Sequence, residues 1–352
     1  MWFYILQNYC NVILMNQGFW KKLKKPIMVL APMADVTDAA FRRIIAKYGK
    51  PDVMWTEFVS ADGLFMGLNR PERTVGRIPQ SGVLGGRDAL LKDLWFTPEE
   101  HPIVAQFFTA KPEMMKKASE LALELGFDGI DINMGCPDRS IEKQGAGAAL
   151  IKTPVLAREI IRAAKEGAGK LPVSVKTRIG YHVNELETWL PELLAEEPAM
   201  ITVHARTRKE MSDVPAHWDA VKRAVEIRDE LKSETLILGN GDVLDLLDAN
   251  KKAKESGADG VMLGRAIFGN PFLFRNKNVP NESEGQYVPT LNEKLTVMIE
   301  HTKLFEELFQ KNPSISTSSR ASVPRGSGQA KNFSIMKKHY KAYIHGFDGA
   351  KE

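Results

Sequence analysis

The sequence predicts an α/β fold, a (β/α)₈ TIM barrel followed by a small C-terminal helical domain. The chain has 352 residues, enough for a barrel of about 250 residues and a smaller domain. Short and nearly continuous apolar runs recur eight times, as expected of parallel strands with both faces covered. Amphipathic segments separate most of these runs and no hairpin turn joins them, which favours a closed barrel over a doubly wound open sheet.

The eight apolar runs are the predicted strands, at residues 27–31, 53–56, 103–107, 129–132, 173–176, 200–204, 235–238 and 260–263. Six amphipathic segments are the predicted barrel helices, at 38–48, 113–125, 154–166, 185–196, 216–232 and 243–256. Asp38 or Thr37 can cap the first helix, and Thr153 followed by Pro154 can begin the third. Glycines stand where helix C-termini need them, at Gly126, Gly167 and Gly257.

The connection between the second and third strands departs from this alternation of apolar runs and amphipathic segments. It runs over residues 66–101 and contains Gly85-Gly86. We expect this connection to include an extra hairpin or a short helix.

The pattern changes after Pro271. Residues 291–311 are predicted to form an amphipathic helix, and residues 333–346 a second, basic one. The stretch between them, 313–330, is rich in Ser, Pro and Gly without periodicity, and we expect it to be a disordered insertion. The predicted divisions are an N-terminal extension of uncertain role, a barrel and a helical domain, at 1–18, 19–275 and 290–352.

The composition narrows the class of protein. Hydrophobic residues make up 43% of the chain and charged residues 26%, so global disorder is not expected. A net charge of +4 is compatible with a polyanionic partner and equally with an ordinary solvated surface. The two cysteines, Cys10 and Cys136, give neither a disulfide framework nor a metal-ligand spacing, so we predict a cytoplasmic protein without a metal site.

Residues 1–15 are apolar and aromatic, and lysines follow them. They lack the charged start and the small-residue cleavage site of a secretory signal. Polar residues interrupt the stretch, which is shorter than the roughly 20 apolar residues that a membrane span requires. An extra packing segment, or a start codon assigned too early, is favoured over a membrane anchor, and no stable membrane association is expected.

Polar and charged residues follow the predicted strands at their C-terminal ends, where barrels of this type carry their working residues. The residues concerned are Ala31-Pro32-Met33-Ala34, Gln106, Asn133 with Cys136, Lys176 with Arg178, His204 with Arg206, Asn240-Gly241-Asp242 and Gly264-Arg265. Alone, a strand-end lysine can face solvent and a histidine can be a satisfied core residue. Their placement together on one rim indicates a site.

The loops after the seventh and eighth strands commonly bind phosphate in such barrels, through backbone amides at glycine-rich turns. Gly264-Arg265 adds a charge-assisted contact to such a turn. A phosphate site together with Lys176 fits flavin mononucleotide, because a cation near the flavin N1/O2 edge stabilises the reduced anion. Gln106 could hydrogen-bond the ring edge, and Cys136, in a Gly/Pro-flanked loop, could donate a proton or act as a nucleophile.

Seven motifs occur in an order that resembles the tRNA-dihydrouridine synthase family. They are APMADVTD at 31–38, NMGCP at 133–137, GAGAAL at 145–150, VKTR at 175–178, HARTR at 204–208, NGD at 240–242 and MLGRA at 262–266. The combination is specific, whereas the APM and GR elements alone would not be. The resemblance runs from about residue 19 to the C-terminus, with the insertion at 313–330 outside it.

The resemblance implies an FMN-bearing barrel and a helical domain that helps to grip tRNA. It implies that NADPH reduces the flavin, that flavin N5 gives a hydride to uracil C6, and that Cys136 protonates C5. By motif position, the FMN contacts would be Pro32, Met33, Ala34, Gln106, Lys176, His204, Asn240, Gly241, Asp242, Gly264 and Arg265. Asn133 and Arg178 would face the uridine or its phosphates.

Further contacts to RNA phosphates are plausible at the rim, from Arg206 and Arg208, and on the basic C-terminal helix. That helix carries Lys337, Lys338, His339 and Lys341, although such a charge run can also be an ordinary solvated face. A target base inside folded tRNA must leave its stack to reach a barrel mouth. We expect tRNA as the partner and a monomeric protein.

The sequence departs from the family pattern at three positions, expected to lie on the substrate side. Thr177 stands where a larger apolar residue is frequent, Ala205 where glycine is common, and Glu210 where many members carry Gln. These departures concern the choice of uridine more than the chemistry.

Three alternatives remain open at this stage. A flavin barrel that reduces a free small molecule, like a dihydroorotate dehydrogenase or an ene-reductase, would have nearly the same site but would not need the basic helical domain. A non-catalytic tRNA-binding protein would keep its function when Cys136 is replaced by Ala. A cofactor-free phosphate-binding isomerase is disfavoured, because no Glu/His base pair is evident at the rim.

Overall fold

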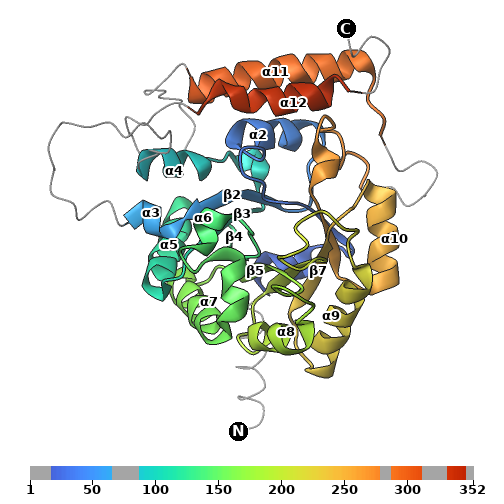
Figure 1. Cartoon of the computed structure of the whole chain (residues 1–352). Helices are drawn as coiled ribbons and strands as arrows, with labels where there is room; N and C mark the ends of the chain where they lie inside the picture. Colours follow the sequence, from blue (N-terminus) through green and yellow to red (C-terminus); the bar gives the residue numbers. More distant parts are fainter. Residues whose placement is uncertain (1–16, 66–86, 278–286, 311–330, 346–352) are drawn as a thin grey trace, which may run out of the picture.

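Eight parallel strands form the centre of the computed structural model, which describes residues 17–65, 87–277, 287–310 and 331–345 (Figure 1). The strands are β1 (Ile27–Leu30), β2 (Met54–Ser60), β3 (Ile103–Phe108), β4 (Gly129–Met134), β5 (Val173–Arg178), β6 (Met200–His204), β7 (Leu236–Asn240) and β8 (Gly260–Leu263). All eight predicted strands are therefore confirmed, with ends that shift by a few residues.

The strand order is β1-β8-β7-β6-β5-β4-β3-β2, and every pair is parallel. A parallel bridge between Val29 and Val53 joins β1 to the start of β2, and the Leu30 amide lies 3.4 Å from the Val53 carbonyl oxygen. The sheet thus closes on itself, which confirms the barrel and excludes the open sheet.

An apolar cluster fills the barrel toward the N-terminal ends of the strands. It includes Val29, Trp55, Val104 and Met262, all at most 1% exposed. Trp20, from the short 3₁₀ helix η1 (Gly18–Lys22), packs against Trp55 with ring centroids 5.8 Å apart. The segment before β1 therefore contributes directly to the barrel core.

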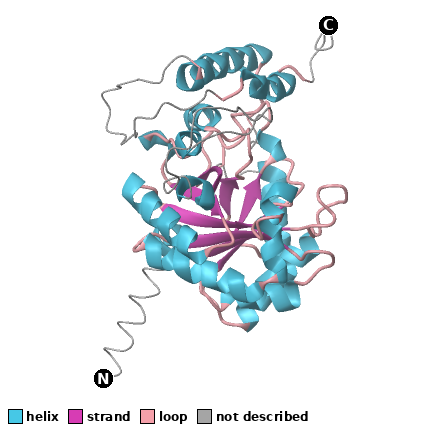
Figure 2. Cartoon of the chain, turned by 60° about the vertical axis from the view of Figure 1, so that its left-hand side comes forward, coloured by secondary structure: helices cyan, strands magenta, loops and turns pink. Residues whose placement is uncertain are grey.

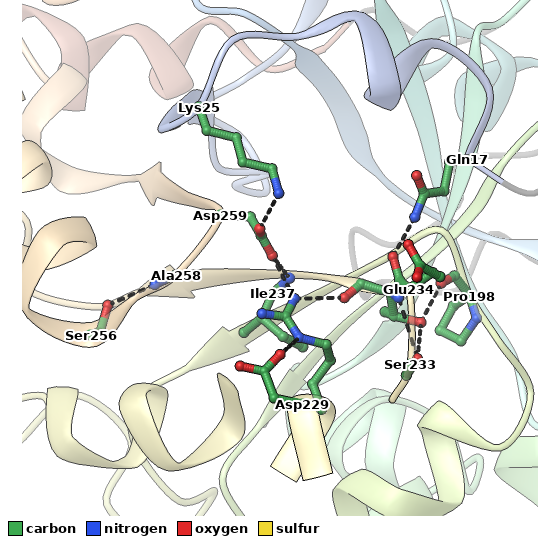
Figure 3. Close-up of polar contacts among 12 residues, drawn as sticks. Gln17, Lys25, Pro198, Asp229, Ser233, Glu234, Ile237, Ser256, Ala258 and Asp259 are labelled. Carbon is green, nitrogen blue, oxygen red and sulfur yellow. Dashed lines mark hydrogen bonds and ion pairs between the residues drawn. The ribbon is translucent and has the colours of Figure 1, made fainter. Parts of the chain in front are cut away.

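Polar contacts also hold this segment against the N-terminal ends of β7 and β8 (Figure 3). Lys25 pairs with Asp259 at 2.5 Å, and the second carboxylate oxygen of Asp259 accepts from the Ile237 amide at 2.8 Å and from Arg228 at 2.9 Å. Gln17 donates to the Glu234 carbonyl. The segment before β1 is thus tied to this end of the barrel, at the opposite strand ends from the predicted site.

Helices surround the strands, as the turned view shows (Figure 2). The six that were predicted are confirmed, as α2 (Ala39–Tyr48), α5 (Pro112–Leu125), α7 (Pro154–Ala168), α8 (Leu186–Leu194), α9 (Trp218–Glu230) and α10 (Leu246–Ser256). Asp38, rather than Thr37, caps α2 by accepting from the Phe41 amide at 2.9 Å. Thr153 occupies the N-cap of α7 without a capping hydrogen bond from its side chain.

The predicted helix-ending glycines are confirmed at two of three positions. Gly126 and Gly257 are left-handed C-caps, with φ of 84° and 73°. The prediction is wrong for Gly167, which lies inside α7, before the helix ends at Ala168. A Cβ at Gly167 would lie 2.2 Å from the Lys116 carbonyl oxygen, so glycine is required there because α5 and α7 approach closely.

The connection between β2 and β3 contains short helices, α3 (Ala61–Phe65), α4 (Arg87–Asp93) and η3 (Pro98–Glu100). These confirm the helical alternative for the described part, whereas residues 66–86 lie outside the described residues. Shorter segments also follow β4 and β8, namely α6 (Arg139–Glu142), η4 (Gly147–Lys152) and η5 (Arg265–Ile267).

The two predicted C-terminal helices are confirmed as α11 (Leu291–Phe309) and α12 (Met336–Tyr343), with a 3₁₀ turn, η6 (Phe333–Ile335), before the second. They lie side by side across α2 in both views (Figures 1 and 2). Phe305, Phe309 and Met336 pack there against Ala39 and Ala40. The predicted insertion at 313–330 and Cys10 in the extension lie outside the described residues.

Within the described ranges, no helix has the length and apolar character needed to cross a membrane.

Candidate functional site

The predicted site residues lie in or directly after the C-terminal ends of the strands. Gln106, Asn133, Lys176, Arg178, His204 and Asn240 are strand residues, whereas Pro32, Met33, Ala34, Cys136, Arg206, Gly241, Asp242, Gly264 and Arg265 follow their strands. Since parallel strands of a closed barrel end at the same rim, the fold brings all of them to one end of the molecule.

Lys176 and Asn240 connect β5 with β7 inside the rim. The Lys176 Nζ donates to the Asn240 Oδ1 at 3.2 Å, and the Asn240 Nδ2 donates to the Met262 carbonyl at 2.7 Å. These two bonds fix the orientation of the amide. Burial, followed by the positive charge of Arg178, lowers the pKa of Lys176 to about 8. Lys176 is thus a cation in a poorly solvated position, where an anionic ligand would be bound strongly.

His204 is held by Arg206, which is itself 2% exposed. The Arg206 Nη1 lies 3.3 Å from the His204 Nε2, and its Nε donates to the Val214 carbonyl at 2.6 Å. Burial, then the charges of Lys176 and Arg178, keep the pKa of His204 well below its usual value, so the ring is neutral. A guanidinium only donates, so Nε2 is the acceptor and Nδ1 carries the proton that a ligand oxygen could accept.

Asp242 is the carboxylate of this rim, and it pairs with both Arg206 and Arg265. Arg265 is 67% exposed in its side chain and lies after β8. Gly241 precedes Asp242 with φ of 123°, and a Cβ there would lie 2.9 Å from the Ala216 Cβ. The turn after β7 therefore requires glycine.

Positive charge exceeds negative charge at the rim. Of the four cationic side chains here, Arg206 and Arg265 pair with Asp242, whereas Lys176 donates to the Asn240 amide and Arg178 to backbone carbonyls. The nearby buried acid, Asp131, has its pKa raised by burial to about 6, so it is mostly ionised at neutral pH and, with Asp242, offsets only part of the four positive charges. An anionic group with several acceptor oxygens, such as a phosphate, would balance this excess.

Cys136 lies on a loop that is held by hydrogen bonds to its backbone amides and to the Cys136 carbonyl. The Asn133 Oδ1 accepts from the amides of Gly135 and Cys136, at 3.1 and 2.9 Å. The Cys136 carbonyl accepts from Ala148 at 2.9 Å. Gly147, with φ of 62°, allows this close return of the chain, since a Cβ there would lie 2.7 Å from the same carbonyl oxygen. Burial raises the pKa of the Cys136 thiol, which is therefore protonated at neutral pH.

A buried hydrogen-bond chain supports this loop from below. The Asn133 Nδ2 donates to the Gln106 Oε1 at 3.2 Å, and the Gln106 Nε2 donates to Asp131 at 2.5 Å. Ser174 donates to the other Asp131 oxygen at 2.5 Å. Sequence reasoning missed Asp131 and Ser174, although strand alternation places Asp131 on the same face as Asn133 and Ser174 on the same face as Lys176.

Arg178 connects the loops after β4 and β6. Its Nε donates to the Gly135 carbonyl at 2.8 Å, and its Nη1 donates to the carbonyls of Thr207 and Met211 at 3.0 and 2.9 Å. Arg208 pairs with Glu142 and lies 5.6 Å from the Tyr181 ring centroid. Both guanidinium groups therefore hold the loops around Cys136 in place.

The three departures from the family pattern have internal contacts. Thr177 and Ala205 are fully buried, and the Trp189 Nε1 donates to the Thr177 Oγ1 at 3.0 Å. Glu210 accepts from the Thr207 amide at 2.7 Å and pairs with His217 at 2.9 Å. These side chains therefore help to shape the loops and do not present a free surface to a substrate.

The basic helix α12 exposes Lys337, Lys338 and Lys341, as expected for a surface that contacts phosphates. The expectation is wrong for His339, which is fully buried against Phe41, with ring centroids 4.6 Å apart. The helical period explains the error, since residue 339 shares the inward face with Met336 and Tyr343.

Comparison with known proteins gives a family match over most of the chain. The family model described as dihydrouridine synthase matches residues 29–352. The probable tRNA-dihydrouridine synthase 2 of Bacillus subtilis (strain 168) is 38% identical over 96% of this chain and 91% of its own length. The probable tRNA-dihydrouridine synthase of Staphylococcus aureus (strain Mu50) is 37% identical over 96% of this chain and 90% of its own.

Solved structures resemble the fold alone. A 2-naphthoyl-CoA reductase in complex with 2-naphthoyl-CoA has a TM-score of 0.53 at 11% identity, covering 74% of this chain and 51% of that protein. Histamine dehydrogenase from Rhizobium sp. 4-9 has a TM-score of 0.50 at 12% identity, covering 79% of this chain and 48% of that one.

Proposed function

Because the chain belongs to the dihydrouridine synthase family, we propose that it reduces the C5=C6 bond of specific uridines in tRNA, with FMN that NADPH reduces. Relatives named as probable tRNA-dihydrouridine synthases align with this chain over 90–91% of their own length. One observation gives the main support for this proposal. The same rim contains an excess of positive charge, with Lys176 poorly solvated, and the protonated thiol of Cys136 on an ordered loop.

The residues present fit FMN. The phosphate would lie against the turns after β7 and β8, near Gly241, Gly264 and Arg265, where the excess positive charge needs an anion. Lys176 would face the N1/O2 edge of the ring and Gln106 another polar edge. The full proposed set is Pro32, Met33, Ala34, Gln106, Lys176, His204, Asn240, Gly241, Asp242, Gly264 and Arg265. When bound and reduced, FMN supplies the hydride that adds to uracil C6.

Cys136 supplies the second half of the reduction. Its thiol is protonated at neutral pH, so it can give a proton to C5 as the hydride reaches C6. The thiolate left behind would be stabilised by the Asp138 amide and by the charges of Lys176 and Arg178, which favour the ionised sulfur. A proton from solvent then restores the thiol, and the uracil ring has gained one hydride and one proton.

The proposed substrate residues are Asn133, Arg178 and Arg206. Asn133 accepts from the Cys136 amide, and Arg178 donates to the Gly135 carbonyl directly before Cys136, so both control the position of the thiol. Arg206 would add positive charge for a nucleotide phosphate. The target uridine would be flipped out of its stack to enter the rim.

The helical domain at 290–352 would hold the rest of the tRNA, and the barrel at 19–275 would carry the chemistry. Lys337, Lys338 and Lys341 of α12 are the described basic residues that fit phosphate binding there. The cytoplasmic location and the monomeric state stay predictions.

The test is a spectrum of the purified protein, followed by addition of NADPH and unmodified tRNA and by an assay for dihydrouridine. Flavin bands that NADPH bleaches and tRNA restores, with dihydrouridine formed, are the expected result. A flavoprotein that tRNA fails to reoxidise would instead be a reductase of a small molecule. A colourless protein that FMN cannot reconstitute would be a tRNA-binding protein without turnover.

A further inference from the structure

A largely buried lysine, Lys331, joins the C-terminal helices to the barrel rim. Lys331 precedes η6, its side chain is 15% exposed, and its Nζ contacts Glu57 of β2 and, at 2.8 Å, Asp93 at the end of α4. The ammonium lies 5.4 Å from the Phe309 ring centroid of α11. The Lys331 carbonyl also accepts from Gln310, which follows α11. Lys331 thus belongs to the helical domain but places its charge in the barrel.

Glu57 extends this contact to the loop between β1 and α2. One carboxylate oxygen of Glu57 accepts a hydrogen bond from Lys331, and the other accepts from the Asp35 amide at 2.5 Å. Asp35 has φ of 54°, a left-handed conformation that a non-glycine residue adopts at a cost. The Glu57 hydrogen bond therefore supports a strained residue in the middle of this loop.

The same loop carries three of the proposed FMN contacts, Pro32, Met33 and Ala34. At its start, the Ala31 amide donates to the Leu263 carbonyl at 2.8 Å, and further along the Met33 amide donates to the Thr37 Oγ1 at 2.9 Å and the Val36 amide to the Met33 carbonyl at 3.1 Å. Glu57 thus supplies a long-range contact that sets where the loop stands relative to the strands.

Charge makes this arrangement dependent on Lys331. The Lys331 ammonium interacts electrostatically with three carboxylates, Glu57, Asp93 and Asp38, the last of which is the N-cap of α2 and is also attracted, more weakly, by Arg42. Burial raises the pKa values of Glu57 and Asp38, and Lys331 opposes that rise. Without the ammonium, a carboxylate of this group would bind a proton, and a protonated Glu57 would accept more weakly from Asp35.

We propose that Lys331 is a positioning residue that couples docking of the C-terminal helices to the conformation of the loop at residues 31–38, so that FMN binding and helix docking stabilise each other. The inference rests on the proposed function, because it takes Pro32, Met33 and Ala34 as FMN contacts. Coupling of this kind is reciprocal, so it can be measured from either side.

The experiment measures FMN affinity by flavin fluorescence on apoprotein, at a temperature where circular dichroism shows each variant to be folded. Lys331→Met is expected to raise the FMN dissociation constant about tenfold. Lys331→Arg, which keeps the charge, is expected to restore most of the affinity. The matched control is Lys303→Met, an exposed lysine on α11, which is expected to bind FMN as the unchanged protein does.

The reciprocal measurement is amide hydrogen exchange over α11 with and without FMN. FMN is expected to slow exchange in the unchanged protein and in Lys303→Met but not in Lys331→Met. A role in stability alone would speed exchange equally with and without FMN, and that result would overturn the inference.

Glu57→Gln tests the same coupling at the carboxylate that links Lys331 to Asp35. This variant replaces Lys331→Met in the experiment if Lys331→Met does not fold. It removes the charge partner but keeps an oxygen facing Asp35, and an FMN affinity reduced several-fold is expected. Affinity within twofold of the unchanged protein, in either folded variant, would exclude the coupling. If the unchanged protein binds no FMN, the proposed function fails and the inference with it, which is a distinguishable result.

Discussion

At the residue scale, Cys136 is the group on which the proposed chemistry depends. Its backbone is fixed by Asn133 and its carbonyl by Ala148, so replacing the side chain should leave the loop intact. Cys136→Ala is expected to keep bound flavin and to lose about 100-fold or more of dihydrouridine formation, because the proton donor to C5 is missing. Single-turnover assays on native unmodified tRNA measure this, and near-normal turnover would exclude the general-acid role.

Lys176 gives a prediction that depends on pH. Its pKa, lowered to about 8 by burial and then by Arg178, means that the apoprotein loses this cation between pH 7 and 9. FMN affinity is therefore expected to fall by about tenfold as the pH rises over that range, since the anionic ligand loses a charge partner. Titrations at several pH values measure the effect. Lys176→Met should bind weakly with a flat profile, and a sloping profile in that variant would assign the effect to another group.

At the element scale, the contact between α5 and α7 depends on Gly167. Gly167→Ala puts a Cβ where the Lys116 carbonyl stands, and is expected to reduce the free energy of unfolding by about 1–3 kcal/mol. Denaturant unfolding measures this. Glu159→Ala, on the exposed face of α7, is the control and should be nearly neutral. A more stable Gly167→Ala would mean that helix propensity outweighs the close approach.

The contact of α11 and α12 with α2 contains two buried histidines, His301 and His339, whose ring centroids lie 4.7 Å apart. Burial, with Lys338 adding a smaller effect, lowers the pKa of His339 from 6.5 to about 4. The unfolded chain therefore binds more protons, so the stabilisation is fully present above pH 6.5 and is lost as the pH falls toward 4. His339 alone should account for about 2 kcal/mol between pH 7 and pH 5.

Unfolding of the unchanged protein and of His339→Leu at these two pH values tests this prediction. The variant is expected to lose less stability on acidification, because one of the buried histidines is gone. The rings that face His339 are those of Phe41, Phe268 and His301, and none of them carries a negative charge to favour the protonated form. An identical loss in both proteins would show that other groups set the acid sensitivity.

At the scale of the whole molecule, the proposed tRNA contacts lie on α12 and the chemistry in the barrel. Replacing Lys337, Lys338 and Lys341 with Ala should raise KM for tRNA and flatten its salt dependence, with kcat nearly unchanged, because phosphate contacts act on binding. Lys222, Lys251 and Lys254 of α9 and α10 form the control set, exposed in the same way. An equal effect of both sets would indicate a general charge effect instead of a surface on α12.

Features that depend on neighbouring residues along the chain could be predicted from the sequence. The eight strands are predicted by local apolar runs. The helices are predicted by apolar residues that recur with the helical period and by caps such as Asp38 and Gly126. The rim residues could also be predicted, because a residue that ends a parallel strand must lie at the common rim. The strand ends alone therefore predict Cys136 and Lys176 as site residues.

Features that depend on residues far apart in the chain could not be predicted before the fold was known. Gly167 was misassigned because its neighbour is the backbone of α5, and His339 because the face of α12 that is buried depends on α2. Asp131 was missed, and Lys331 had no predicted role, because their importance comes from partners on other elements. Burial and charge balance depend on which groups surround a side chain, and a linear pattern does not specify those groups until the barrel closes.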